Sequence, residues 1–347
     1  MNSSSAQPAV RVGLKDIAAR AGVSIGSVSS VLKNLDIERR IPAATAERIR
    51  RTAAELGYLP NITARSLRTG GGASSTVLLA LITSFEAPIP LVNLFITSLR
   101  RRAEQIGGLP NFALMIEMFS VGELKKLPGL ITGDFFNAAI ITNTITEDDQ
   151  FLSRSRLPYP SVLVNRCIPD YSSVMEDRDS GARAAEILVT ISKRNNIVVL
   201  YGTPLTQATH VRVQAFNKWN TERAGGPVVE IVADSLSERG GYEAMRTFLA
   251  SGRKCDGVYA VSDALALGAY KAIKGQGLSI PNDISVLGVG DYEIVPFLDP
   301  PLSSVGVSHE RMADETSRLL LGQLQKRYTE PKQIFLPIHE VLRESTR

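Results

Sequence analysis

Two short stretches near the start of the chain carry apolar residues at helical spacing, and a glycine separates them. In the first stretch, positions i, i+3, i+4 and i+7 form one buried helix face, made of Leu14, Ile17, Ala18 and Ala21. Gly22 then supplies the left-handed backbone that a sharp turn needs. Ser24 is a favourable N-cap for the second helix, whose inward stripe is Val28, Val31 and Leu32. The pattern predicts a helix-turn-helix.

The second predicted helix leaves a small, uncharged outer surface, formed by Ile25, Gly26, Ser27, Ser29 and Ser30. Such a surface fits against base-pair edges, so we expect this helix to enter a major groove of DNA. An ordinary pair of surface helices gives the same pattern, and this stretch alone leaves both interpretations open.

A third helix is predicted from the stretch AATAERIRRTAAELG, where Ala46, Ile49, Ala53 and Leu56 share one face and Gly57 marks the end. Basic residues are concentrated in this part of the chain. Residues 1–72 contain eleven Lys and Arg against five Asp and Glu, a net charge of +6, while the whole chain has +4, so the remainder carries −2. A local positive charge is expected where one end of a protein meets phosphates.

The stretches DIAARAGVSIGSVSSVLKN and ELGYLPNITARSLRTG closely resemble the lactose-repressor and galactose-repressor family of bacterial transcription regulators. The resemblance runs through nearly the whole chain. It implies a hinge helix of the form NxxAxxLR, in which Leu67 and its mate from a second subunit wedge between base steps in the minor groove. A flexible linker with an incidental leucine is the alternative for this segment. The DNA-contacting residues expected from motif and resemblance are Lys15, Ser24, Ile25, Gly26, Ser27, Ser29, Ser30, Lys33, Asn61, Ala64, Leu67 and Arg68.

This chain departs from the family at two places in the DNA-binding region. Ser30 stands where the family usually carries an arginine that contacts guanine, which removes about 1–3 kcal/mol of base discrimination. The connection between the second and third helices is also longer than usual and contains Arg39 and Arg40, which are candidates for restoring phosphate affinity.

Composition fits a globular regulator. The 347 residues are 44% hydrophobic, and apolar runs such as VLLALI are too short to span a bilayer. The N-terminus lacks the apolar segment of a secretory signal, and Cys167 and Cys255 are isolated, as expected for a cytoplasmic protein. Neither a metal site nor a cofactor is predicted.

Beyond residue 75, short apolar strands alternate with helical patterns, which predicts an α/β fold of doubly wound parallel sheets. The expected strands begin at Val77, Phe112, Ala138, Ser161, Ile197, Val228, Gly257 and Ile284. The expected helices cover 91–105, 181–192, 211–223, 239–250 and 264–274. Eight strands suggest two sheets, and the resemblance implies two lobes like those of periplasmic sugar-binding proteins.

The predicted domains are a helix-turn-helix domain at 1–60, a hinge helix and linker at 61–75, and an effector-binding and dimerisation core at 76–347. The chain is expected to cross between lobes near Asn165, near Asp291 and after Arg327. One subdomain would then hold 76–165 and 292–327, and the other 166–291 and 328–347. Ligands of open parallel sheets bind at the carboxyl ends of strands, so the cleft between the lobes is the expected pocket.

The resemblance supplies candidates for that pocket. Arg212, in HVRVQAF, matches the family's SxxRxxGF arginine, which anchors a hydroxyl, carboxylate or phosphate of the effector. Asp263, which follows Ser262, and Asp177 match family positions whose side chains either cap a helix or contact the ligand. The sequence leaves both roles open for each residue. Weaker candidates lie in the loop after the first strand, Glu86 and Ile89.

Two usual sugar contacts are missing. Gly290 stands in place of the first of two acidic or amide residues, leaving Asp291, and Leu236 stands where an aromatic ring often stacks on the sugar. The effector is therefore expected to be a modified sugar, a phosphate or acid, a nucleobase-like ring, or absent altogether.

An enzyme is the rival class. GVGDYE lacks the third glycine of GxGxxG, and no GxSxG, Walker or HExxH motif occurs. The three histidines have no nucleophile or metal spacing. The sequence therefore predicts a cytoplasmic homodimeric transcription regulator, a repressor rather than an activator, that binds DNA and a small molecule. No membrane partner is predicted. The alternatives are a regulator without an effector and a solute-binding protein without a DNA role.

Overall fold

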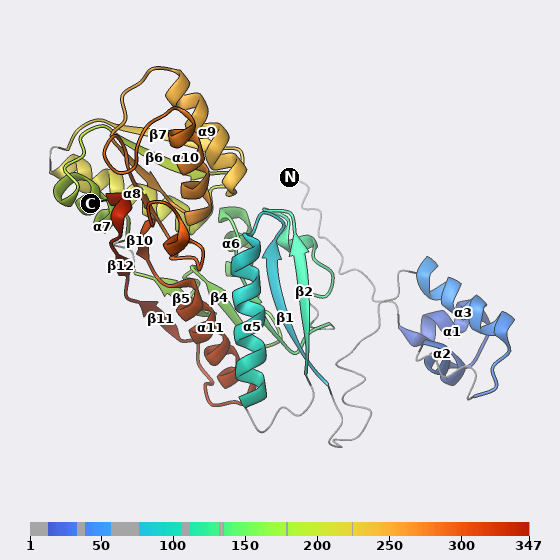
Figure 1. Cartoon of the computed structure of the whole chain (residues 1–347). Coiled ribbons are helices and arrows are strands. Elements are labelled where there is room, and N and C mark those ends of the chain that lie inside the picture. Colours follow the sequence, from blue (N-terminus) through green and yellow to red (C-terminus); the bar gives the residue numbers. More distant parts are fainter. Residues whose placement is uncertain are drawn as a thin grey trace, which may run out of the picture. The chain divides into compact units, whose positions relative to one another are not determined.

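The computed structural model describes residues 13–32, 39–56, 76–105, 112–131, 133, 135–177, 180–223 and 225–346. The chain divides into two compact units, a small helical one and a large α/β one (Figure 1). The expected DNA contacts Lys33, Asn61, Ala64, Leu67 and Arg68 lie outside the described residues.

The helical unit contains α1 (Leu14–Ala21), α2 (Ile25–Leu32) and α3 (Ala43–Glu55). Gly22 ends α1 with φ 65° and ψ 41°, the left-handed conformation that the sequence predicts there. All three predicted apolar faces meet in one core, whose buried members are Ile17, Ala18, Ala21, Val28, Val31, Ala46, Ile49 and Ala53. Leu14, Leu32 and Leu56 pack against this core and are partly buried.

The large unit is built on two six-stranded sheets, which confirms the predicted two-lobed α/β fold. The first sheet has the order β11-β5-β4-β3-β1-β2 and is parallel throughout. Its strands are β1 (Val77–Ser84), β2 (Phe112–Phe119), β3 (Ala138–Ile141), β4 (Ser161–Val164), β5 (Ser172–Glu176) and β11 (Gln333–Leu336).

The second sheet has the order β12-β10-β9-β8-β6-β7, with β12 antiparallel to β10 and the other pairs parallel. Its strands are β6 (Ile197–Gly202), β7 (Val228–Ala233), β8 (Gly257–Ala260), β9 (Ser285–Gly288), β10 (Ser303–Gly306) and β12 (His339–Val341).

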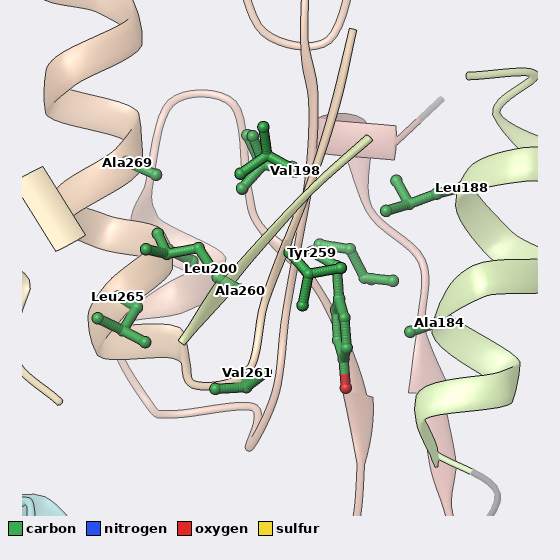
Figure 2. Packing of buried hydrophobic residues seen from close by; sticks show 14 of the residues in the cluster. Ala184, Leu188, Val198, Leu200, Tyr259, Ala260, Val261, Leu265 and Ala269 are labelled. Carbon is green, nitrogen blue, oxygen red and sulfur yellow. The ribbon is translucent and has the colours of Figure 1, made fainter. Parts of the chain in front are cut away.

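Helices cover both faces of these sheets, so central strands are apolar on both sides. In β1, Leu79 and Leu81 face one hydrophobic cluster, while Ala80 and Ile82 face another. In the second lobe, Leu265 and Ala269 lie on one side of the sheet and Ala184 and Leu188 on the other (Figure 2). The helices are α5 (Ile89–Gln105), α6 (Thr146–Ser153), α7 (Ser180–Glu186), α8 (Gln207–Glu222), α9 (Glu238–Ala250), α10 (Asp263–Gly275) and α11 (His309–Leu324).

The crossings between the lobes lie later in the chain than the sequence indicated. Asn165 forms a tight turn with φ 56° between β4 and β5, and both strands belong to the first sheet. Asp291, with φ 51°, likewise precedes β10 of the second sheet. The chain instead crosses after β5, between β10 and α11, and between β11 and β12. The predicted crossings near Asn165, near Asp291 and just after Arg327 are therefore wrong.

Part of the error has a physical cause, because two of the strands that were missed, β5 and β10, do not look apolar. Both β5 and β10 begin with paired serines. Ser172 Oγ accepts a hydrogen bond from the Lys332 amide at 2.9 Å, and Ser303 Oγ accepts one from the Arg343 amide at 2.8 Å. Hydroxyls that are satisfied in this way are tolerated inside a sheet, although a hydropathy pattern does not reveal them. Within the described part of the chain, none of the helices has the length and apolar character needed to span a bilayer.

Candidate DNA-binding surface and effector cleft

The turn between α1 and α2 positions the candidate recognition helix. Ser24 Oγ accepts a hydrogen bond from the Ser27 amide at 3.0 Å, and the two serine hydroxyls lie 2.9 Å apart. Ser24 therefore caps α2 as predicted, and its hydroxyl group also forms a hydrogen bond with the hydroxyl group of Ser27.

The outer surface of α2 is small and carries no charge. Ile25 is 44% exposed at the first turn of the helix, and Gly26 beside it is also exposed. Ser29 and Ser30 are partly exposed, whereas Val28 and Val31 point into the core. Lys15 is exposed on α1. The structure thus presents the predicted α2 residues on the face that the core leaves free.

A cavity of about 760 Å³ lies in the large unit, between α6 and the ends of β4 and β5 on one side and α8 on the other. Its volume is typical of small-molecule sites. Its walls therefore come from both lobes. Among the predicted effector contacts, Arg212 and Asp177 line this cavity.

Arg212 is held by a carboxylate that the sequence did not single out. This arginine, on α8 of the second lobe, forms a two-point ion pair with Glu176, the last residue of β5 in the first lobe. The side chains are 10% and 9% exposed, and Arg212 Nη1 also donates to the Val261 carbonyl at 3.1 Å. The Arg212 nitrogens are thus all engaged within the protein, and the pair joins the two lobes.

Buried aromatic and imidazole groups surround this ion pair. Burial alone disfavours the charged form of Glu176, but Arg212 outweighs it and holds the pKa of the carboxyl below its usual value. Burial lowers the pKa of the His309 imidazole to about 4, and Arg212 acts in the same direction. The His309 ring lies 5.1 Å from the ring of Tyr292, and among the described residues neither its Nδ1 nor the Tyr259 hydroxyl has a hydrogen-bond partner.

Asp263 is fully buried and makes contacts within its own lobe. Ser262 is the N-cap of α10, and Asp263 is the first residue of that helix. The Asp263 carboxylate accepts hydrogen bonds from the Tyr292 amide at 2.9 Å and from Ser304 Oγ at 3.0 Å. Burial raises its pKa to about 6. Through these two hydrogen bonds, Asp263 links the loop that follows β9 to strand β10.

The residues around Gly290 explain why this position lacks a side chain. Gly290 has φ +121°, and a Cβ placed there would approach His309 Cε1 to 2.5 Å. Asp291, the acidic residue that remains, pairs with Arg343 at 2.8 Å. Neither Gly290 nor Asp291 lines the cavity beside Arg212.

The other predicted cleft residues are also absent from the walls of this cavity. Glu86 and Ile89 are exposed at the start of α5, where Ile89 is 81% exposed. Leu236 packs against the hydrophobic core of the second lobe. These residues are not brought together with Arg212 in one described cavity.

Two residue pairs in the cavity wall escaped the sequence analysis. Glu176 precedes Asp177 directly, and the motif match drew attention to the second of these two acids. Arg166 is 3% exposed and pairs with Asp149 at 3.2 Å, and both line the cavity. In the sequence, Arg166 follows its partner Asp149 by 17 positions, and Arg212 follows its partner Glu176 by 36. The fold brings these residues together, so no local sequence pattern marks the pairs.

Comparison with known proteins gives a consistent result across the chain. Residues 13–61 match the family described as bacterial regulatory proteins, lacI family, and residues 192–346 match the periplasmic binding protein-like domain. The HTH-type transcriptional regulator CelR of Thermobifida fusca is 27% identical over 343 residues, covering 96% of this chain and 98% of that protein. The HTH-type transcriptional repressor CytR of Escherichia coli K12 is 26% identical over 351 residues, covering 96% of each.

Solved structures agree with the architecture. The complex of the transcriptional regulator CelR with cellobiose matches with a TM-score of 0.64 and 25% identity over 96% of this chain and all of that one. The lac repressor dimer bound to operator and anti-inducer matches in fold with a TM-score of 0.70 and 24% identity, over 97% and 99% of the chains. Regulators of this kind, and not enzymes, are thus the relatives of the protein. The chain thus carries a DNA-binding domain of the lacI family at residues 13–61 and a periplasmic binding protein-like domain at residues 192–346, and its relatives over nearly its whole length are transcriptional regulators.

Proposed function

We propose that this transcription regulator is a cytoplasmic homodimer that represses by binding a pseudo-palindromic operator and responds to a small molecule held between its core lobes. The observation that carries the proposal is the presence of both sites in one chain. An exposed helix-turn-helix surface lies in one unit, and a cavity walled by two lobes lies in the other.

The DNA-binding part of the proposal rests on shape and charge. The outer face of α2 offers Ile25 and small neighbours to a major groove, without the side chains that grip guanine. The net charge of +6 in residues 1–72 supplies attraction to phosphates. The hinge residues Asn61, Ala64, Leu67 and Arg68 and the recognition-helix residue Lys33 are proposed as further contacts.

The effector part rests on the cavity. A ligand that contacts both α6 and α8 binds the two lobes at once and therefore favours one arrangement of them over another. Arg212 and Asp177 are proposed as wall residues of this site. The other predicted effector contacts do not line this cavity, and their role stays a prediction: Asp263, Asp291, Gly290, Leu236, Glu86 and Ile89.

Selection of bound genomic fragments by the full-length protein, followed by fluorescence anisotropy, tests this proposal. We expect a two-fold symmetric site whose affinity falls steeply with salt, because several phosphates are neutralised. Light scattering should give a dimer, the assembly in which the lac repressor of the comparison structure binds its operator. Failure to enrich any sequence would favour a solute-binding protein without a DNA role, and a tetramer would contradict the assembly.

A hinge variant separates the two parts of the DNA interface. Leu67→Ala should weaken operator binding and reduce DNA bending while leaving the dimer intact, because the apolar wedge is lost and the helix-turn-helix remains. Ala19→Ser, on the exposed face of α1, is a matched control that leaves the wedge unchanged. If Leu67→Ala bends and binds the selected operator like the parent, the hinge assignment is wrong.

A further inference from the structure

The cationic side chains that line the cavity are each paired with a carboxylate of the same chain. Arg212 pairs with Glu176, Arg166 with Asp149 at 3.2 Å, and the rim residue Lys218 approaches Glu222 to 3.8 Å. The cavity wall also holds the carboxylate of Asp177. An anionic ligand therefore meets negative charge at the same places where it would seek positive charge.

The Glu176 carboxylate occupies the position beside Arg212 in which the carboxylate of an acidic ligand would otherwise bind. Its two oxygens accept hydrogen bonds from Nε and Nη2, which form one edge of the Arg212 guanidinium, and Nη1 donates to the Val261 carbonyl at 3.1 Å. The Nε/Nη2 edge of the guanidinium, which binds a carboxylate in a two-point manner, is therefore filled, and each Nη nitrogen keeps one further N–H. An incoming carboxylate or phosphate must displace Glu176 to make the same two-point contact with Arg212, and at the remaining N–H groups it meets the negative charge of Glu176.

We propose that Glu176 permanently occupies the anion position of Arg212, so that this regulator excludes acidic and phosphorylated effectors. Its effector is instead an uncharged compound whose hydroxyl groups donate hydrogen bonds to the Glu176 carboxylate. The ligand class rests on the proposed function of the cleft, whereas the occupancy of Arg212 by Glu176 is a property of the chain alone.

Glu176→Ala tests the occupancy directly, because the substitution removes Cγ and the carboxylate, a fragment with the shape of acetate. Since Glu176 lines the cavity, acetate has a route to the vacated position. We expect the variant to melt below the parent and 100 mM acetate to raise its Tm by about 3 °C. Acetamide, which has nearly the same shape without the charge, and sodium chloride at equal ionic strength should have no such effect.

Glu340→Ala is the matched control. Glu340 also forms a two-point pair with an arginine, Arg183, at 2.6 and 2.8 Å, but the two side chains are 39% and 29% exposed and lie outside the cavity wall. Acetate should leave this variant and the parent unchanged. Equal stabilisation of the parent, or absence of rescue in Glu176→Ala, overturns the occupancy. If Glu176→Ala does not fold by itself, the yield of refolded protein with acetate against acetamide decides the same question.

The ligand class is tested on the selected operator with matched pairs of compounds, such as glucose with gluconate and cellobiose with cellobionate. We expect every compound that alters operator affinity of the parent by tenfold or more to be uncharged. An acid that acts as strongly as its neutral counterpart overturns the exclusion. If no compound of a broad metabolite panel acts, effector control in the proposed function fails, while the acetate experiment still decides the role of Glu176.

Discussion

Removal of the Arg212 guanidinium should be among the most damaging single changes in the core. Arg212→Ala leaves the Glu176 carboxylate without a cation at a side-chain exposure of 9%. Breaking a buried pair by removing one partner costs about 3–5 kcal/mol of unfolding free energy. We therefore expect a loss of this size, since the other basic group that acts on Glu176 is His309, whose pKa is lowered to about 4 so that the imidazole is uncharged near pH 7.

Urea unfolding of the full chain measures this loss. Trp219 is the single tryptophan and lies on α8, the helix that carries Arg212, where it packs against the core of the second lobe. Its fluorescence therefore reports on the lobe that is perturbed. The double variant Arg212→Met with Glu176→Leu should recover most of the loss, because apolar replacement of a whole buried pair is neutral or stabilising.

An exposed pair gives the contrast. Arg183→Ala, which breaks the pairs with Glu340 and Glu186, should cost about 1 kcal/mol or less because these side chains are 29%, 39% and 42% exposed and surface pairs contribute little. The reasoning is refuted if Arg212→Ala unfolds within that same margin of the parent. It is also refuted if the double variant is no more stable than Arg212→Ala.

Other perturbations have equally definite outcomes. The pKa of Asp263 is about 6, above the ordinary value of about 4, so the free energy of unfolding falls as the pH rises between these two values. Asp263→Asn should abolish this pH dependence in urea unfolding measured across the same range. The pKa of His309 is about 4, below the ordinary value of about 6.5, so stability is lost as the pH falls through that window. His309→Phe should therefore reduce acid sensitivity, and an unchanged pH profile would contradict the assignment. Gly290→Ala should cost about 1–3 kcal/mol from its φ of +121°, and addition of His309→Ala should recover the part due to the clash. Ser30→Arg should enrich guanine in selected operators, with about 1–3 kcal/mol of discrimination, and an unaltered consensus would show that Ser30 does not face the bases.

The helical unit was predictable to single residues because its signals are local. Ile17, Val28 and Ile49 are fully buried, as the helical spacing required, and Gly22 has the predicted left-handed conformation. Each signal spans a few positions, and the three helices have few ways to bury their apolar faces together. The two-sheet α/β architecture followed in the same way from apolar strands separated by helices.

The connections and the cleft depend on contacts that no local window contains. Strand β5 reads as a polar loop in SSVME, yet pairing on both sides buries its first four residues. Because β5 lies in the first sheet, Glu176 ends on the first lobe, directly opposite Arg212 on the second. A motif match recovered Arg212 from its own neighbourhood, but its partner is set by the order of strands in the sheet. The sequence therefore predicted the cation of the cleft and missed its counterion.

Gly290 stands where the family resemblance predicts an acid, and the carboxylate that pairs with Arg212 belongs to Glu176 instead. A side chain at position 290 and the imidazole of His309 cannot share the available space, since a Cβ would lie 2.5 Å from the ring. An acid at 290 would stand on the same lobe as Arg212, after β9, whereas Glu176 stands on the other lobe, at the end of β5. The negative charge of the cleft thus comes from the opposite wall, and its attraction to Arg212 acts between the lobes. Because a ligand shifts an equilibrium only by its differential affinity for two states, we expect an effector of this chain to add contacts to both lobes beside an intact Glu176–Arg212 pair.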